Sequence, residues 1–322
     1  MLFRWFCATP LLVFASAAYV AHAAYPDRPI RLIAPFAPGG NIDITARTIS
    51  PGLTEQLGQS VIVENRGGAG GRIGTEVVAK SAPDGYTMLL GSSGSLTVNP
   101  AFATTPSYDP IKDFAPTSLV SIVPLVLVTH PSLPVTSAKE FIALAKAKPG
   151  TVMMASAGTG SNTHLTGELF QVITGAKLTH VPYKGSGPAL IDLMGGQTHC
   201  IFDQVSTSAP HVSVGKLRAI AITAVKRSPL MASVPTMDES GVRGFEAATY
   251  TGVFLPAATP KDIVHRVYTA LLKVLDQPAT RDAFTRLGAD VIKSTPEELT
   301  KRMVTDLAKW KKVQQQTGIK LD

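Results

Sequence analysis

Residues 25–47, YPDRPIRLIAPFAPGGNIDITAR, contain the first complete unit of the fold. IRLIA at 30–34 is a short, mostly apolar run, which is typical of a buried strand. The loop PFAPGG follows it, and an amphipathic pattern then predicts a helix over 41–58. A strand, a glycine-rich loop and a helix in this order indicate an α/β fold.

The same alternation continues along the chain. Thr259-Pro260 and Thr295-Pro296 each place a capping residue before a proline, which predicts two helix starts near the C-terminus. Repeated strand–helix units favour an α/β architecture with mostly parallel sheets. The further predicted strands are SVIVE (60–64), YTMLL (86–90), PLVLVTH (124–130), TVMMAS (151–156), KLTHVP (177–182), HCIFD (199–203), LRAIAIT (217–223) and YTGVFLP (250–256), and GRIGTEVVAKSA (71–82) is a second predicted helix.

Two long, proline-punctuated segments, 113–131 and 245–260, bracket a block that has its own strand–helix alternation. A chain that leaves one sheet, builds a second and returns needs two such crossings. We therefore expect two lobes with a hinge and a cleft between them. Lobe 1 is expected at 24–127 and 249–322, and lobe 2 at 128–248. Two tandem domains with one linker are the alternative, but the C-terminal helices would then have no sheet to cover.

Five predicted strands run directly into small, polar or glycine-rich loops. In open α/β sheets, ligands bind beyond the carboxyl ends of the strands. Glycine allows the backbone to approach a ligand, and free N–H groups at a helix start favour anions. Hydroxyl groups of Ser93, Thr159 and Ser161 can add donors. The loops are PFAPGGN (35–41), GSSGS (91–95), SAGTGSN (156–162), YKGSG (183–187) and DQVS (203–206), and each of them taken singly could also be an ordinary turn.

The N-terminus predicts export from the cytoplasm. MLFR carries a positive charge, an apolar stretch of small residues follows, and Ala21-His22-Ala23 resembles a cleavage site. We expect residues 1–23 to be a signal peptide that is removed near Ala23, so that the mature chain lies in the periplasm. Cys7 would leave with that peptide, and Cys200 would then be a lone, buried thiol without a disulfide partner.

The net charge of +7 does not indicate nucleic-acid binding. The basic residues are scattered, and aromatic residues make up only 7% of the chain, so neither a continuous basic stripe nor a stacking platform is present. A mild positive potential that attracts anions is the simpler interpretation.

The sequence offers little support for catalysis. ENRGGAGGRIG fits neither a dinucleotide-binding nor a P-loop motif, and no G-x-S-x-G nucleophile elbow occurs. His164 and Glu168 are four residues apart on one predicted helix face, but no third metal ligand is evident. His180 and His199 lie in strands and are expected to be packed. We therefore expect no enzyme activity, no cofactor and no metal; a secreted α/β enzyme acting on an acidic metabolite is the alternative.

Seven segments together resemble the Bug (TctC-like) extracytoplasmic solute receptors of tripartite tricarboxylate transporters, over almost the whole mature chain. They are 25–47, VIVENRGGAGGRIGTE (61–76), PDGYTMLLGSSG (83–94), GTGSNTHLTGELF (158–170), HVPYKGSGPALIDLMGGQ (180–197), FDQVSTSAPHVSVGKLRAIAIT (202–223) and VPTMDESG (234–241). The resemblance implies a type II periplasmic-binding-protein fold, with two lobes joined by two crossing segments that close on a carboxylate. It also implies membrane transporter subunits as partners.

The loops and the resemblance together give a set of expected ligand-binding residues on a protein that we expect to be monomeric. Asp43 has an alternative role, because a carboxylate in the first turn of a helix stabilises its N-terminus. Members of the family often carry Trp near Tyr250-Thr251-Gly252 and small residues at Asn41-Ile42, so the identity of the ligand does not transfer. We expect a small dicarboxylate or a related acid. The expected contacts are Phe36, Ala37, Gly39, Asp43, Ser92, Ser93, Ser156, Thr159, Ser161, Asn162, Tyr183 and Asp203.

Overall fold

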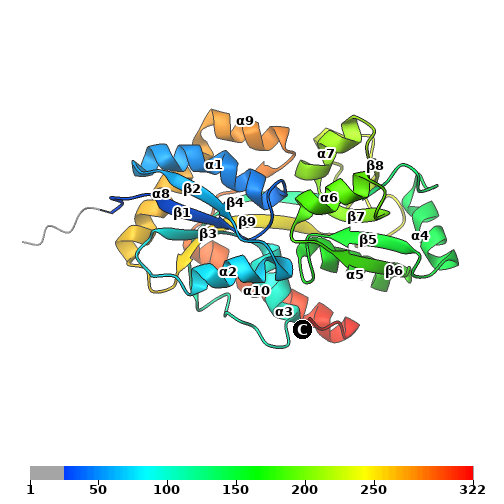
Figure 1. Ribbon diagram of the computed structural model, residues 1–322, viewed down its shortest axis with the longest axis horizontal. Coiled ribbons are helices and arrows are strands. Elements are labelled where there is room, and N and C mark those ends of the chain that lie inside the picture. Colours follow the sequence, from blue (N-terminus) through cyan, green and yellow to red (C-terminus); the bar gives the residue numbers. More distant parts are fainter. Residues whose placement is uncertain (1–24, 322) are drawn as a thin grey trace, which may run out of the picture.

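The computed structural model describes residues 25–321, so the predicted signal peptide at 1–23 lies outside the described residues. Ten strands form a hydrogen-bonded network with helices on both faces. Figure 1 shows two lobes side by side, with β4 (Phe114–Thr129) and β9 (Ala248–Pro256) running between them. The predicted α/β fold with two lobes and two crossing segments is confirmed.

The sheet of the first lobe has three parallel strands that continue into the antiparallel β9. Alternate residues of each strand point to opposite helical layers. Leu32 belongs to the core that includes residues of α1 and α8, whereas Ile33 belongs to the core that includes residues of α2 and α10. The elements are β1 (Ile30–Ala34), β2 (Val61–Asn65), β3 (Thr87–Ser92), α1 (Asn41–Leu57), α2 (Arg72–Ala79), α8 (Lys261–Asp276) and α10 (Pro296–Thr317).

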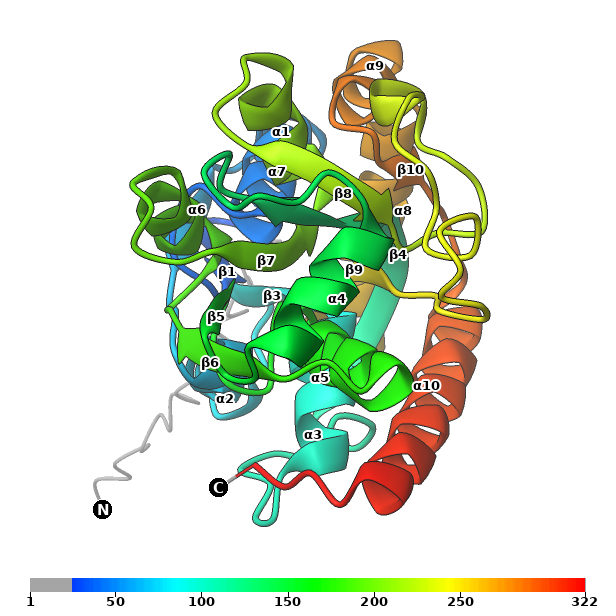
Figure 2. The same cartoon turned by 90° about the vertical axis from the view of Figure 1, so that its right-hand side faces the viewer.

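The second lobe repeats this plan. Its strands β5, β6 and β7 are parallel, and the antiparallel β4 pairs with both β7 and β8. Figures 1 and 2 show α6 and α7 on one side of this sheet and α4 and α5 on the other. The elements are α4 (Ala138–Ala147), β5 (Val152–Ser156), α5 (Asn162–Thr174), β6 (Leu178–Pro182), α6 (Ser186–Met194), β7 (Cys200–Gln204), α7 (Val205–Ser213) and β8 (Arg218–Ile222).

Strand β4 connects the two sheets. Its residues from Phe114 to Pro124 pair with β9, and those from Leu125 to Thr129 pair with β7 and β8. Beyond that point Leu127 packs in the core under α4 and α5, while Val128 packs in the core under α6 and α7. One long strand therefore contributes to the cores of both lobes.

The remaining elements are short, and two of them, η2 and α3, are buried. Near the C-terminus the backbone of Leu321 exchanges hydrogen bonds with Phe102 and Thr104, so the chain end is held beside α3, as Figure 2 shows. No helix within residues 25–321 has the length and apolar character needed to cross a membrane. The remaining elements are η1 (Ala69–Gly71), η2 (Gly94–Val98), α3 (Asn99–Phe102), η3 (Pro229–Met231), α9 (Pro278–Arg286) and β10 (Asp290–Val291).

The two predicted helix starts near the C-terminus have different outcomes. Thr295 caps α10 as predicted, and Pro296 is the first helical residue. The prediction for Thr259 is wrong by one position, because α8 begins at Lys261 and Pro260 is its N-cap. The Thr259 hydroxyl instead donates to the Pro256 carbonyl at 2.7 Å, so it does not cap the helix.

Candidate ligand-binding site

The loops at the carboxyl ends of the parallel strands face each other across the junction of the lobes and line a small pocket. This edge of an α/β sheet is where ligands bind in open sheets of this kind. Residues from both lobes and from the crossing strand β9 contribute. The pocket is lined by Phe36, Gly40, Asn41, Ile42, Ser92, Gly94, Ala157, Ser161, Asn162, Thr163, Ser186, Gln204 and Thr249.

Four helices begin at this pocket. Gly40, Ser161 and Gln204 are the N-caps of α1, α5 and α7, and Ser186 is the first residue of α6. The first N–H groups of a helix have no partner within the helix and carry a partial positive charge. Because the lining residues have no charged side chain, these helix ends provide the positive potential of the pocket.

Asn41 presents an unused donor to the pocket. Its Oδ1 accepts a hydrogen bond from Ser206 Oγ at 2.8 Å, which fixes the orientation of the amide across the lobe junction. Its Nδ2 is buried and has no hydrogen-bond partner among the described residues. A buried amide donor without a partner costs free energy, so a polar group of a ligand would stabilise it.

Asn162 and Gln204 serve the crossing strand. Asn162 Nδ2 donates to Thr249 Oγ1 at 2.7 Å and to the Ala248 carbonyl at 3.1 Å, and Gln204 Nε2 donates to Thr249 Oγ1 at 3.0 Å. Both residues line the pocket, yet their amide nitrogens hold the start of β9 against the second lobe.

The lobes are in direct contact around the pocket. The Ala37 N–H donates to the Lys184 carbonyl at 2.9 Å, which joins a loop of the first lobe to one of the second. Gly187 lies so close to Pro38 that a Cβ atom at Gly187 would overlap the Pro38 carbonyl. This is a closed arrangement of the two lobes.

Four of the expected ligand contacts line the pocket, namely Phe36, Ser92, Ser161 and Asn162. The other eight lie behind or beside the lining. Among them, Ser93 is buried with a hydroxyl that has no partner, and Thr159 borders a separate hollow with Asn99 and Arg72. The eight residues are Ala37, Gly39, Asp43, Ser93, Ser156, Thr159, Tyr183 and Asp203.

The two carboxylates of that set have protein partners. Asp43 accepts hydrogen bonds from the Gly39 N–H at 3.0 Å and from Arg47 Nε at 2.9 Å. Burial raises the pKa of Asp43, but these donors more than offset burial and leave the pKa below its ordinary value. Asp203 is fully buried and accepts from Thr207 and Ser208, and burial raises its pKa above the ordinary value in spite of those bonds.

Tyr183 and Ser156 are also engaged. The Tyr183 hydroxyl donates to Asp192 at 2.7 Å, and Tyr183 does not line the pocket. Ser156 Oγ accepts from the Gly158 N–H at 3.1 Å and lies 2.6 Å from His180 Nε2. Ser156 therefore supports the loop that carries Ser161 and does not itself line the pocket.

Sequence reasoning missed Thr249 as a lining residue. It lies at the start of β9, in a crossing segment that the sequence marks only as extended and proline-flanked. Asn41, Ser186 and Gln204 fall inside loops that the sequence does single out, but nothing in their spacing distinguishes them from their neighbours. Within residues 25–321, no group of three His, Cys, Asp or Glu side chains is placed to hold a metal ion.

The fold and the pocket define a two-lobed solute-binding protein. A family model described as the tripartite tricarboxylate transporter family receptor matches residues 45–319, so the chain belongs to this family. The chain is 42% identical to BugT of Bordetella pertussis over 306 residues, which cover 95% of this chain and 94% of that protein. The family-level prediction is confirmed.

Solved structures are similar over nearly their whole length. The periplasmic binding protein BugD has a TM-score of 0.89 at 36% identity, covering 92% of this chain and 99% of BugD. A protein of R. palustris with adipate has a TM-score of 0.88 at 36% identity, covering 92% and 99%. MatC from Rhodopseudomonas palustris with bound malate has a TM-score of 0.87 at 34% identity, covering 90% and 99%. Of these three, BugD is described as a periplasmic binding protein, and the other two hold adipate and malate.

Proposed function

We propose that the protein is a periplasmic receptor that captures a small organic dicarboxylate, about the size of malate or adipate. The observation that carries the proposal is the closed pocket with four helix N-termini and no charged lining residue. Backbone N–H groups at helix starts bind anions without a guanidinium clamp. One of these helices, α1, begins in the first lobe, and the other three, α5, α6 and α7, begin in the second. A ligand with an acidic or polar group at each end can therefore bind to both lobes.

The pocket favours a ligand without an ammonium group. A buried ammonium needs a carboxylate or several carbonyl oxygens to replace its water. No lining residue is acidic. Asp43 pairs with Arg47, and Asp203, which accepts from Thr207 and Ser208 through Oδ2 and has no partner at Oδ1 among the described residues, lies outside the lining. A plain or hydroxylated acid therefore fits this pocket better than an amino acid does.

The same lining supports binding without catalysis. It contains no His, Cys, Lys, Asp or Glu that could act as a general base. Ser161 Oγ lies 2.9 Å from Thr163 Oγ1 and accepts from the His164 N–H, so it caps α5 and has no basic partner. An enzyme acting on an acidic metabolite would need such a base near the ligand.

The proposal also covers the lobe boundaries, export and partners of the protein. The lobes are proposed at 24–127 with 249–322 and at 128–248, which agrees with β4 changing partners after Pro124. A signal peptide would direct export and be removed near Ala23. The mature protein would act as a monomer, bind no nucleic acid, and pass its ligand to membrane transporter subunits.

A thermal-shift screen of organic acids tests this function. A ligand at 100 times its Kd raises the free energy of unfolding by about 2.7 kcal/mol, so binding acids stand out. Native mass spectrometry of the protein purified from the periplasm then identifies any retained ligand. Stabilisation by an amino acid or a sugar, and by no plain dicarboxylate, would refute the proposal.

A further inference from the structure

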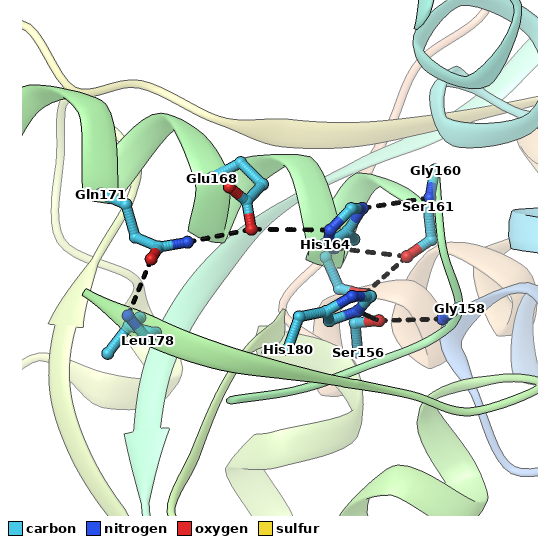
Figure 3. Close-up of polar contacts among 10 residues, drawn as sticks. Ser156, Gly158, Gly160, Ser161, His164, Glu168, Gln171, Leu178 and His180 are labelled. Carbon is cyan, nitrogen blue, oxygen red and sulfur yellow. Dashed lines mark hydrogen bonds and ion pairs between the residues drawn. The ribbon is translucent and has the colours of Figure 1, made fainter. Parts of the chain in front are cut away.

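One wall of the pocket depends on two stacked histidines. The loop Gly158–Ser161 leads into α5 and carries Ser161, which lines the pocket and caps the helix. His164 on α5 and His180 on β6 lie under this loop with ring centroids 3.8 Å apart and planes inclined by 21°. Figure 3 shows both rings between the loop and Glu168.

His164 binds one N–H group of the loop directly, and His180 contacts the serine that binds another. The Gly160 N–H donates to His164 Nδ1 at 3.1 Å. The Gly158 N–H donates to Ser156 Oγ at 3.1 Å, and that oxygen lies 2.6 Å from His180 Nε2. Gly158 and Gly160 have φ angles of +126° and +80°, so the loop follows a path that other residues rarely adopt and that these contacts fix.

The contacts also fix which nitrogen of His164 carries a proton. Because Nδ1 accepts from a backbone N–H, the proton of the neutral ring is on Nε2, which lies 3.6 Å from Glu168 Oε1. Protonation of Nδ1 would place two hydrogens against each other at Gly160. The loop would have to move, and with it the N-terminus of α5.

The ionisable groups packed against His164 are Glu168 on the same helix and His180 on β6. Burial and, to a smaller extent, the neighbouring His164 lower the pKa of His180 to about 4 against the opposing effect of Glu168, so His180 is neutral near pH 7. Burial raises the pKa of Glu168, but contact with His164 and His180 more than offsets this and keeps the carboxylate charged. The charged Glu168 carboxylate lies 3.6 Å from His164 Nε2.

We propose that His164 is a positioning residue for the ligand site, and that a proton on its Nδ1 releases the loop Gly158–Ser161 and weakens ligand binding in acid. The inference rests on the proposed function, since it assigns a pH response to the same pocket. Histidine is suited to this role because its charge changes between about pH 5 and 8.

Two substitutions at His164 separate its role as a hydrogen-bond acceptor from the packing of its ring. In His164→Asn, the amide oxygen occupies the place of Nδ1 and accepts from Gly160, but it does not titrate. In His164→Phe, the ring still packs on His180, but the acceptor is gone. His265→Asn on the exposed face of α8 is the control for a change of histidine far from the site. Circular dichroism checks that each variant is folded, and either variant together with the parent is enough for the test.

Calorimetric titrations with malate and adipate at pH 7.5 and 5.5 measure the response. We expect the Kd of the parent and of His265→Asn to rise on the order of tenfold at the lower pH, which is the size of a lost hydrogen bond or somewhat more. His164→Asn should lose most of that rise in Kd. Protonation of the acid itself affects the parent and the variants equally, so the difference in pH dependence between the parent and His164→Asn is due to His164. His164→Phe should bind weakly at both pH values.

Hydrogen exchange of the loop without ligand separates this inference from the proposed function. The Gly160 amide should lose protection in His164→Phe, and in the parent when the pH is lowered, after correction for intrinsic exchange. If His164→Asn keeps the pH response of the parent, or if His164→Phe binds as tightly as the parent at pH 7.5, the inference is wrong. If no acid binds while the exchange result holds, the proposed function fails and the contact of His164 with the loop stands.

Discussion

Asn41 is the side chain that tests the chemistry of the pocket most cleanly. Its Nδ2 has no partner among the described residues, and its Oδ1 is fixed by Ser206. Asn41→Asp keeps the shape and the bond from Ser206 but replaces the donor by a negative oxygen. A hydrogen bond to a charged group contributes about 1.5–3 kcal/mol. We therefore expect a loss of affinity for a carboxylate of about 10- to 150-fold or more.

Calorimetry measures the affinity of Asn41→Asp for the acid, and Gln197→Glu is its control. Gln197 is exposed on the second lobe, so that variant adds the same charge far from the pocket. If both variants bind the acid equally well, Asn41 does not face the anion. Ser161→Ala is a weaker test, because Ser161 also caps α5 and its loss costs helix stability as well.

Asp203 makes the free energy of unfolding depend on pH. Burial raises its pKa in the folded state above the unfolded value of about 3.9. The contribution of such a group is complete below the unfolded pKa and is lost as the pH rises through the folded pKa. Asp203→Asn does not ionise, so we expect it to be more stable than the parent at pH 8 and similar to it at pH 3.5.

Urea unfolding at the two pH values measures this difference. Asp282→Asn on the exposed face of α9 should show no comparable gain at pH 8. A variant of Asp203 that is less stable than the parent at pH 8 would mean that the bonds from Thr207 and Ser208 need a charged carboxylate.

At the scale of elements, α10 shows how a local signal determines a helix start. The Glu298 N–H donates to Thr295 Oγ1 at 3.2 Å, and the Thr295 N–H donates to Glu298 Oε2 at 2.9 Å, which is a capping box. We expect Thr295→Ala to lower the free energy of unfolding by about 1 kcal/mol. Thr305→Ala in the same helix removes only a bond to the Lys301 carbonyl and should be close to neutral. Equal effects in urea unfolding would contradict the cap.

The pattern of apolar residues and the alternation of strand and helix segments made most of the fold predictable from the sequence. Buried strands such as 30–34 are apolar on both faces, because helices cover both sides of the sheet. The predicted start at Thr259 failed because its hydroxyl could bond either way along the chain, and a sequence does not show which carbonyl is near. The lining residue Thr249 was not predictable, since a crossing strand reaches the pocket only through tertiary packing.

At the scale of the whole molecule, the two lobes must approach closely to enclose the ligand. A Cβ atom at Gly187 would overlap the Pro38 carbonyl of the other lobe, and no contact within its own lobe is comparably close. Gly187→Ala should therefore fold normally and resist closure. We expect at least tenfold weaker binding and a radius of gyration that does not fall on addition of ligand in small-angle scattering.

Gly195→Ala is the matched control at the other end of α6. Its Cβ atom would lie no closer than 3.5 Å to a neighbour, which is ordinary contact. This variant should bind and contract like the parent. Normal closure of Gly187→Ala would show that the lobes do not need the approach seen at Pro38.

The central claim is that an uncharged pocket at the lobe junction binds a carboxylate as an anion through helix N-termini. Calorimetric titration of the parent with adipate and malate, and with the corresponding diamides, tests this most directly, because the diamides keep the shape but lose the charge. The account predicts one site per chain that binds at least one acid and binds its diamide far more weakly. Equal binding of acid and diamide would contradict it. It would also be contradicted if calorimetry detected no binding of any acid that the thermal screen had selected.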